Sequence, residues 1–81
     1  MEWMTRTEIM DQVNRLNERV IKNLASDEPM HQKRAIRLAN EAKLLKYAAD
    51  NATDEELRLA QIVLPGRGSV MLWAEKQIKE A

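Results

Sequence analysis

The chain has 81 residues, with 13 basic and 13 acidic side chains and no cysteine. This length fits one domain, residues 1–81. A domain of this size has a thin core, which binding partners or self-association often complete. The lack of cysteine excludes disulfides and thiolate metal sites, and zero net charge argues against non-specific binding to nucleic acid or a membrane surface. No stretch is long and apolar enough to span a membrane, and no signal-peptide pattern opens the chain. We therefore expect an intracellular, cytoplasmic protein.

Good helix formers dominate the composition, whereas glycine and proline are scarce. Both glycines lie in the stretch 65–68, directly after a proline, and the other proline, Pro29, stands alone. The one strand-like run, residues 62–64, is too short to found a sheet. We predict an all-α protein, a small helical bundle or hairpin of two long and two short helices.

The first helix is predicted at about residues 5–25. Thr5 and Glu8 fit a capping box, in which the two side chains satisfy free backbone N–H groups of the first turn. The apolar residues that follow recur every three or four positions and therefore share one side of the helix: Ile9, Val13, Leu16, Val20 and Leu24.

The second helix is longer and is predicted at about residues 28–51. Before it, the segment 26–29 combines a cap candidate, two carboxylates and a proline, which end one helix and start the next. The side expected to face the core is rich in alanine, which allows another helix to approach closely: Ala35, Leu38, Ala39, Ala42, Leu45 and Ala49.

Two shorter helices are predicted at about residues 54–63 and 69–80. The third helix opens with a capping box from Thr53 to Glu56, and its expected core residues are Leu57, Ala60, Val63 and Leu64. The fourth helix follows the break at 65–68, begins with Ser69 as its cap, and carries on one side Val70, Trp73, Ala74 and Ile78.

Few residues could perform catalysis, so we expect a protein that is not an enzyme and that uses no metal or cofactor. His31 is the sole histidine, and no cysteine can act with it as a nucleophile. The carboxylates at 54–56 are explained by the helix macrodipole. The stretch 65–69 lacks the glycine spacing and the lysine of a phosphate-binding loop, although an anion could still bind the amides at 68–70.

The second face of the long helix is more informative. On the side away from the alanine-rich stripe lie Ile36, Asn40, Leu44 and Tyr47. Lys33 and Arg37 lie on the same side, nearer the N-terminus. Two apolar faces on one helix indicate either burial of the second face, under the first helix, or a partner outside the fold. An aromatic ring beside cations is also the combination that a base and a phosphate require.

The last third of the chain offers an alternative function, a small helix-turn-helix DNA-binding regulator. Its apolar residues fall near the positions that such a motif needs. A recognition helix starting at Ser69 would, however, present Met71 and Leu72 to the DNA, and residues 53–81 carry no basic excess. We therefore do not expect nucleic acid as the partner. A helical adaptor that occludes a host protein is a further alternative.

Short motifs in the second, third and fourth helices carry a resemblance to a known family: Gln32-Lys33, Arg37-Leu38, Glu56, Leu59-Ala60, Val70-Met71-Leu72-Trp73-Ala74 and Ile78. Through them the chain from about residue 26 to 80 resembles the small phage-encoded hairpin proteins that sequester cyclic oligonucleotide signals in anti-CBASS and anti-Thoeris defence evasion. The resemblance implies a homo-oligomer in the host cytoplasm whose protomers clamp a cyclic di- or trinucleotide without hydrolysing it.

The expected ligand site combines four residues. Lys33 and Arg37 are one helical turn apart and could address two phosphates. Tyr47 lies about 15 Å further along the helix, so we expect it to serve a neighbouring protomer's pocket or the interface. Arg67, between the two glycines, could bring a guanidinium and a backbone amide to one phosphate. The expected interface residues are Ile36, Asn40 and Leu44.

Overall fold

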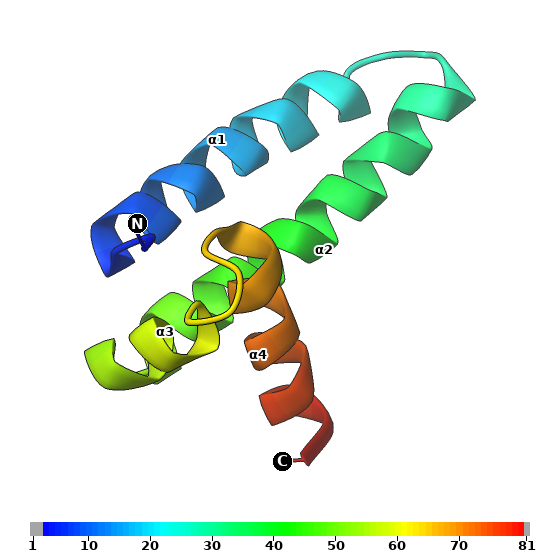
Figure 1. Ribbon diagram of the computed structural model, residues 1–81. Coiled ribbons are helices and arrows are strands. Elements are labelled where there is room, and N and C mark those ends of the chain that lie inside the picture. Colours follow the sequence, from blue (N-terminus) through cyan, green and yellow to red (C-terminus); the bar gives the residue numbers. More distant parts are fainter. Residues whose placement is uncertain (1–2, 81) are drawn as a thin grey trace.

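The computed structural model describes residues 3–80, which form four helices (Figure 1): α1 Arg6–Leu24, α2 Pro29–Asn51, α3 Asp54–Ala60 and α4 Arg67–Glu80. No strand occurs among these residues, so the predicted all-α fold class is confirmed. None of the helices in this part of the chain has the length and apolar character needed to cross a membrane.

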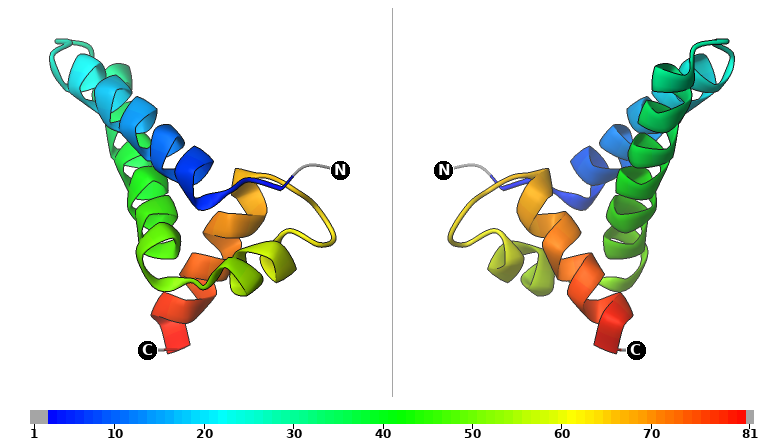
Figure 2. Two further views of the ribbon diagram at one scale, coloured as in Figure 1. Left: turned by 90° about the vertical axis from the view of Figure 1, so that its left-hand side faces the viewer. Right: turned by 90° about the vertical axis from the view of Figure 1, so that its right-hand side faces the viewer.

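The helices form two unequal parts. α1 and α2 lie side by side and antiparallel as a hairpin, and α4 packs against α2. Figure 2 shows that α3 and α4 fold against the end of the hairpin that carries the N-terminus. The other end, with the turn at residues 25–28, extends away from them, in a molecule that measures 42 × 27 × 20 Å.

Both predicted capping boxes are present and fix the starts of α1 and α3. The Thr5 hydroxyl accepts a hydrogen bond from the amide of Glu8 at 3.2 Å, and the Glu8 carboxylate accepts one from the amide of Thr5 at 3.3 Å. Thr53 and Glu56 form the same reciprocal pair at 3.1 and 2.9 Å. These local signals explain why the predicted starts were accurate.

The predicted end of the third helix and the predicted start of the fourth differ from the structure, whereas the start of α3 and the end of α4 match. α3 ends at Ala60 rather than at residue 63, because the chain turns outward after Gln61. α4 begins at Arg67, after Gly66 adopts a φ of 126° that favours glycine. Ser69 therefore lies inside α4 and is not its cap; its hydroxyl donates to the carbonyl of Leu64 at 2.6 Å.

The core lies where the hairpin meets α3 and α4. Its buried apolar residues are Ile9, Val13, Leu16, Leu38, Ala42, Leu45, Ala48, Ala49, Ala52, Leu57, Val70 and Ala74. Five residues expected on the apolar sides of the helices are instead exposed, namely Leu24, Ala39, Val63, Leu64 and Ile78. Leu24 lies at the extended end of the hairpin, where no further helix covers it, and Val63 and Leu64 lie in the loop that replaces the end of the predicted third helix.

Gln61 is the one polar side chain buried in the described core. Its Oε1 accepts hydrogen bonds from the amides of Met4 at 2.8 Å and Gly66 at 3.2 Å. Its Nε2 donates to the carbonyls of Met4 at 3.0 Å and Leu57 at 3.1 Å. Both donor hydrogens and the acceptor oxygen are thus used, and one side chain joins the N-terminal segment, α3 and the following loop.

Arg6 makes a second long-range connection. Its guanidinium donates to the carbonyls of Ala49 and Ala52, the latter at 2.7 Å, and to the carboxylate of Asp54 at 2.9 Å. The Ala49 carbonyl belongs to the last turn of α2 and the Ala52 carbonyl to its C-cap, where free acceptors and the negative end of the helix dipole favour a cation. Arg6 therefore fixes the start of α1 to the junction between α2 and α3.

Candidate functional site

Three cationic side chains gather on the exposed first half of α2. Lys33, Arg34 and Arg37 line, together with Met30, a shallow hollow of about 380 Å³. Spacings of three and four residues place these side chains on one side of the helix. The structure thus brings together Lys33 and Arg37, as expected, and adds Arg34 and Met30. Arg34 and Met30 were not predicted from the sequence, although they share the same helical register.

The cations of the hollow lack ion-pair partners. Among residues 3–80, no carboxylate pairs with Lys33, Arg34 or Arg37, although Glu41 follows Arg37 by one turn. Four other basic residues of the described chain are paired: Lys46 contacts Asp50 at 2.9 Å and Lys79 contacts Glu75 at 3.2 Å, besides the contacts of Arg6 with Asp54 and of Arg58 with Glu55. Single cations elsewhere among these residues, such as Lys22, Lys43 and Arg67, also have no ion pair, so the distinguishing feature of the hollow is that three unpaired cations lie together. A ligand entering the hollow would therefore meet positive charge without displacing an internal partner.

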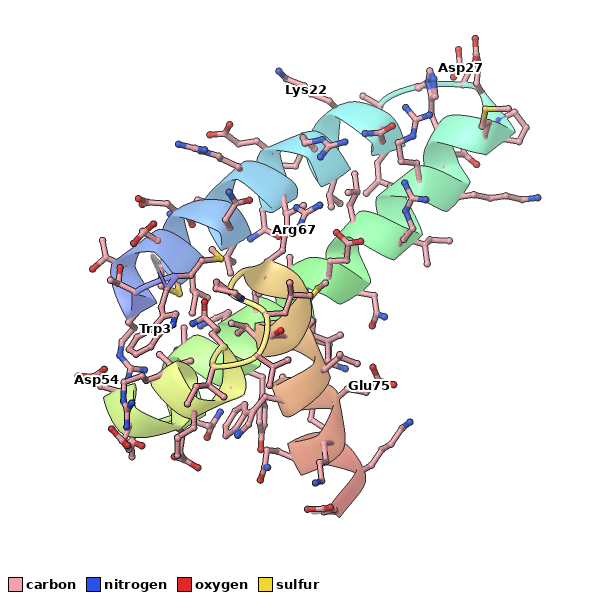
Figure 3. The ribbon with its side chains drawn as sticks, viewed as in Figure 1. Trp3, Lys22, Asp27, Asp54, Arg67 and Glu75 are labelled. Atoms are coloured by element: carbon pink, nitrogen blue, oxygen red, sulfur yellow. The ribbon has the colours of Figure 1, made fainter. Side chains whose placement is uncertain are left out.

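Two further residues predicted for this site lie elsewhere. Tyr47 is half-buried and packs against Trp73 of α4, with ring centroids 6.3 Å apart and planes tilted by 41°. Arg67 is exposed at the start of α4, whereas the hollow lies toward the hairpin turn that Asp27 marks in Figure 3. Neither residue lines the hollow. Tyr47 therefore contributes to packing within the fold.

The second face of α2 divides into two halves. Ile36, with 71% of its surface exposed, and Asn40 are open to solvent in the outer half. In the inner half Leu44 is partly buried and packs on the core, as do Met71 and Trp73 of α4. The sequence predicts either burial of this face under the first helix or a partner outside the fold. α4 packs on α2 at this inner half, where Trp73 lies against Tyr47, and Leu44 belongs to the packing inside the fold.

A second cleft, of about 520 Å³, lies at the other end of the molecule and includes Trp3, Arg6, Asp54 and Arg58 in its lining. Its charged groups already engage one another. The Arg58 guanidinium lies 5.5 Å from the centre of the Trp3 ring and also pairs with Glu55. The hydrogen bond from Arg58 lowers the pKa of Glu55, and the carboxylate raises the pKa of Arg58. These contacts hold the terminal segment in place and leave little free charge for a ligand.

His31 has a structural role at the hairpin turn. Its Nδ1 lies 2.8 Å from the hydroxyl of Ser26, and its Nε2 lies 3.7 Å from the Glu28 carboxylate. The Ser26 hydroxyl also accepts from the amide of Glu28 at 3.2 Å, so all three residues organise the start of α2. Within the described residues, no group of three histidine or acidic side chains is placed to hold a metal ion.

Comparison with known proteins found no relative of this chain. No family model matches the chain, and no curated protein or solved structure was found to be similar to it. The resemblance to the phage hairpin proteins stays a prediction that depends on the short motifs.

Proposed function

We propose that the protein is a non-enzymatic binding protein that holds a phosphate-bearing ligand in the cationic hollow of α2. The class of ligand is a cyclic di- or trinucleotide, as in the phage proteins that the sequence resembles. The observation that supports this proposal is the group formed by Lys33, Arg34 and Arg37, three exposed cations without an ion-pair partner beside an exposed methionine.

The chemistry of these side chains suits a phosphodiester. A guanidinium can donate two parallel hydrogen bonds to phosphate oxygens, and a lysine ammonium acts as a compact point charge. Met30 adds a flexible, polarisable surface against which a base can lie. The hollow is shallow, so one copy of the chain contacts one side of such a ligand. This fits the expectation that two protomers share it.

Calorimetric titration with a panel of cyclic di- and trinucleotides tests the proposal. We expect at least one of them to bind wild type, and Lys33→Ala/Arg37→Ala to weaken that binding roughly a hundredfold or more, because each charge-assisted contact contributes about 1.5–3 kcal/mol. Chromatography of the recovered ligand should show it intact, as a sequestering protein requires.

A matched control is Lys22→Ala/Lys43→Ala, which removes the same charge from exposed residues outside the hollow. We expect this variant to bind nearly as well as wild type. The proposal fails if wild type binds none of the panel. It also fails if the control loses as much affinity as the hollow variant, because attraction would then come from general charge.

The helix-turn-helix alternative gains no comparable support. In the region from α3 to α4, Arg58 pairs with Glu55 and Lys79 pairs with Glu75. The exposed side of α4 also carries Leu72, which cannot donate a hydrogen bond to a base or a phosphate.

A further inference from the structure

Charge is distributed unevenly between the two parts of the molecule. Residues 15–40, which form the part of the hairpin nearer its turn, contain six basic and three acidic side chains, a net charge of +3. The rest of the chain has seven basic and ten acidic side chains, a net charge of −3. The zero net charge of the whole chain therefore conceals a cationic end and an anionic end.

Five of the six cations form two rows, one on each helix of the hairpin. Arg15 and Arg19 are one turn apart on α1, and Lys33, Arg34 and Arg37 line the hollow on α2. Because the two helices are antiparallel, Arg19 and Arg34 lie equally far from the turn at 25–28, and Arg15 and Arg37 nearly so. We call these five residues the hairpin cationic face.

Both rows lie on the side of the hairpin that α4 approaches. Tyr47, which packs on α4, follows Lys33 by nearly a whole number of helical turns, so the hollow on α2 lies on that side. On α1, Arg15 lines a small hollow together with Met4, and Gln61 joins Met4 to the residue before α4. Figures 1 and 2 show α4 and the loop before it against one side of the hairpin.

Acidic side chains lie at the edges of the hairpin cationic face. Of the three in residues 15–40, two belong to the turn, and Glu18 projects from another side of α1 than its neighbour Arg19. Asp11 and Glu41 stand one helical turn beyond the cations, and neither forms an ion pair among residues 3–80. Like charges one turn apart destabilise a helix, so an external anion would relieve the repulsion within each row.

We propose that the hairpin cationic face binds the phosphate backbone of a nucleic-acid strand without reading its sequence. Arginine donates paired hydrogen bonds to phosphate oxygens, and each phosphate that a cation neutralises releases counterions. A small ligand in the hollow contacts α2 alone, whereas a strand, with a phosphate at every nucleotide, can contact both rows. Arg15 and Arg19 therefore distinguish this proposal from the binding of a cyclic nucleotide, which depends on the residues of the hollow.

A lipid bilayer is another extended polyanion, but its chemistry fits this face less well. Helices that lie on a membrane bury apolar side chains beside their cations. The lining of the hollow on α2 offers one, Met30. On α1, the exposed Ile21 follows Arg19 by two positions and so projects from a nearly opposite side of the helix. We therefore favour nucleic acid and use anionic vesicles as a comparison.

Fluorescence anisotropy with a labelled oligothymidylate of about 20 nucleotides, at several salt concentrations, tests the proposal. Each phosphate contact on a single strand contributes about −0.7 to the slope of log K against log salt, so four or five contacts predict a slope of about −3. At 0.1 M salt each contact then contributes about fivefold in affinity. Arg15→Ala/Arg19→Ala should weaken binding roughly 25-fold and make the slope shallower by about 1.4. Both residues are exposed, so circular dichroism should show unchanged helicity.

The matched control is Lys43→Ala/Lys76→Ala, which removes the same charge from exposed residues outside the hairpin cationic face. We expect this variant to bind the strand within about twofold of wild type. A strand of mixed sequence should bind as well as oligothymidylate. Calorimetry with the cyclic nucleotides should be unchanged in Arg15→Ala/Arg19→Ala, so the two proposals have separate readouts.

Four results would overturn the proposal. The first is a wild type that binds no strand, whatever it does with cyclic nucleotides. The second is an equal loss of affinity in the control, since general charge would then explain the attraction. The third is strand binding that Lys33→Ala/Arg37→Ala abolishes but Arg15→Ala/Arg19→Ala leaves intact, which would confine binding to the hollow. The fourth is tighter binding to phosphatidylserine vesicles than to the strand, which would assign the face to a membrane.

Discussion

Gln61 provides the sharpest test of how the fold is held together, because every hydrogen-bonding group of its buried side-chain amide has a partner. In Gln61→Leu, the amide and carbonyl of Met4 and the carbonyl of Leu57 lose their partner, as does the amide of Gly66. A buried polar group without a partner costs about 1–3 kcal/mol. Met4 and Gly66 are only partly buried and can recover water, so we expect a total loss of about 2–4 kcal/mol.

That loss is large for a chain of this size. Small domains have an unfolding free energy of about 5–15 kcal/mol, and 1 kcal/mol shifts the thermal midpoint by about 4–8 °C. We therefore expect Gln61→Leu to lower the Tm by roughly 10–25 °C, measured by circular dichroism. Gln32→Leu, at an exposed position on α2, is the control and should change the Tm little. A Tm of Gln61→Leu within a few degrees of wild type would refute the reasoning.

Gln61→Glu should make the stability of the fold depend on pH. The new carboxyl group would be buried, with one oxygen facing the carbonyl oxygens of Met4 and Leu57; these two conditions raise its pKa above the ordinary value of about 4.3 and outweigh the amides of Met4 and Gly66, which still donate to its other oxygen. A raised pKa means that the folded state holds the proton more strongly than the unfolded state. The variant should therefore lose stability, relative to wild type, as the pH rises from about 4 to 7. Gln61→Leu should show no such trend, because leucine does not titrate.

Three further predictions concern other parts of the fold. Arg6→Ala should lower the unfolding free energy by about 1–3 kcal/mol in urea titrations, because carbonyls at the end of α2 lose their donor. Thr53→Ala should cost about 1 kcal/mol in the same assay through loss of a helix cap. Tyr47→Ala should lower the Tm, because Tyr47 packs on Trp73, yet leave nucleotide affinity unchanged; a selective loss of affinity would return Tyr47 to the ligand site.

Local signals made most of the helix positions predictable. Within each capping box, and between neighbouring residues of the apolar stripe of α1, the residues are only three or four positions apart in sequence. α1 and α2 match their predicted bounds to within one residue. The run at 62–64 was misleading, because an apolar segment normally continues toward the core. Here the long-range bonds of Gln61 turn the chain outward before that run.

Part of the candidate site was predictable because its residues are close together in sequence, on one helix. Lys33, Arg34 and Arg37 share a helix face, which spacing alone indicates. The position of Tyr47 depends on α4 packing against α2, a contact between segments far apart in sequence. The pairing of Gln61 with Met4 likewise joins residues 57 positions apart, and no periodic pattern in the sequence predicts it.

Contacts that join residues close in sequence can form before contacts that join distant residues. α1 and α2 meet across the short turn at 25–28, whereas the bonds between Met4 and Gln61 close a far longer loop. Closing a longer loop costs more chain entropy, so the hairpin can form first and the N-terminal segment can dock last. In the reverse direction, release of Gln61 frees the amides of Met4 and Gly66 together while α2 keeps its hydrogen bonds. Loss of the Gln61 bonds would therefore let the segment at Met4 and the loop before α4 detach while the α1–α2 hairpin stays intact.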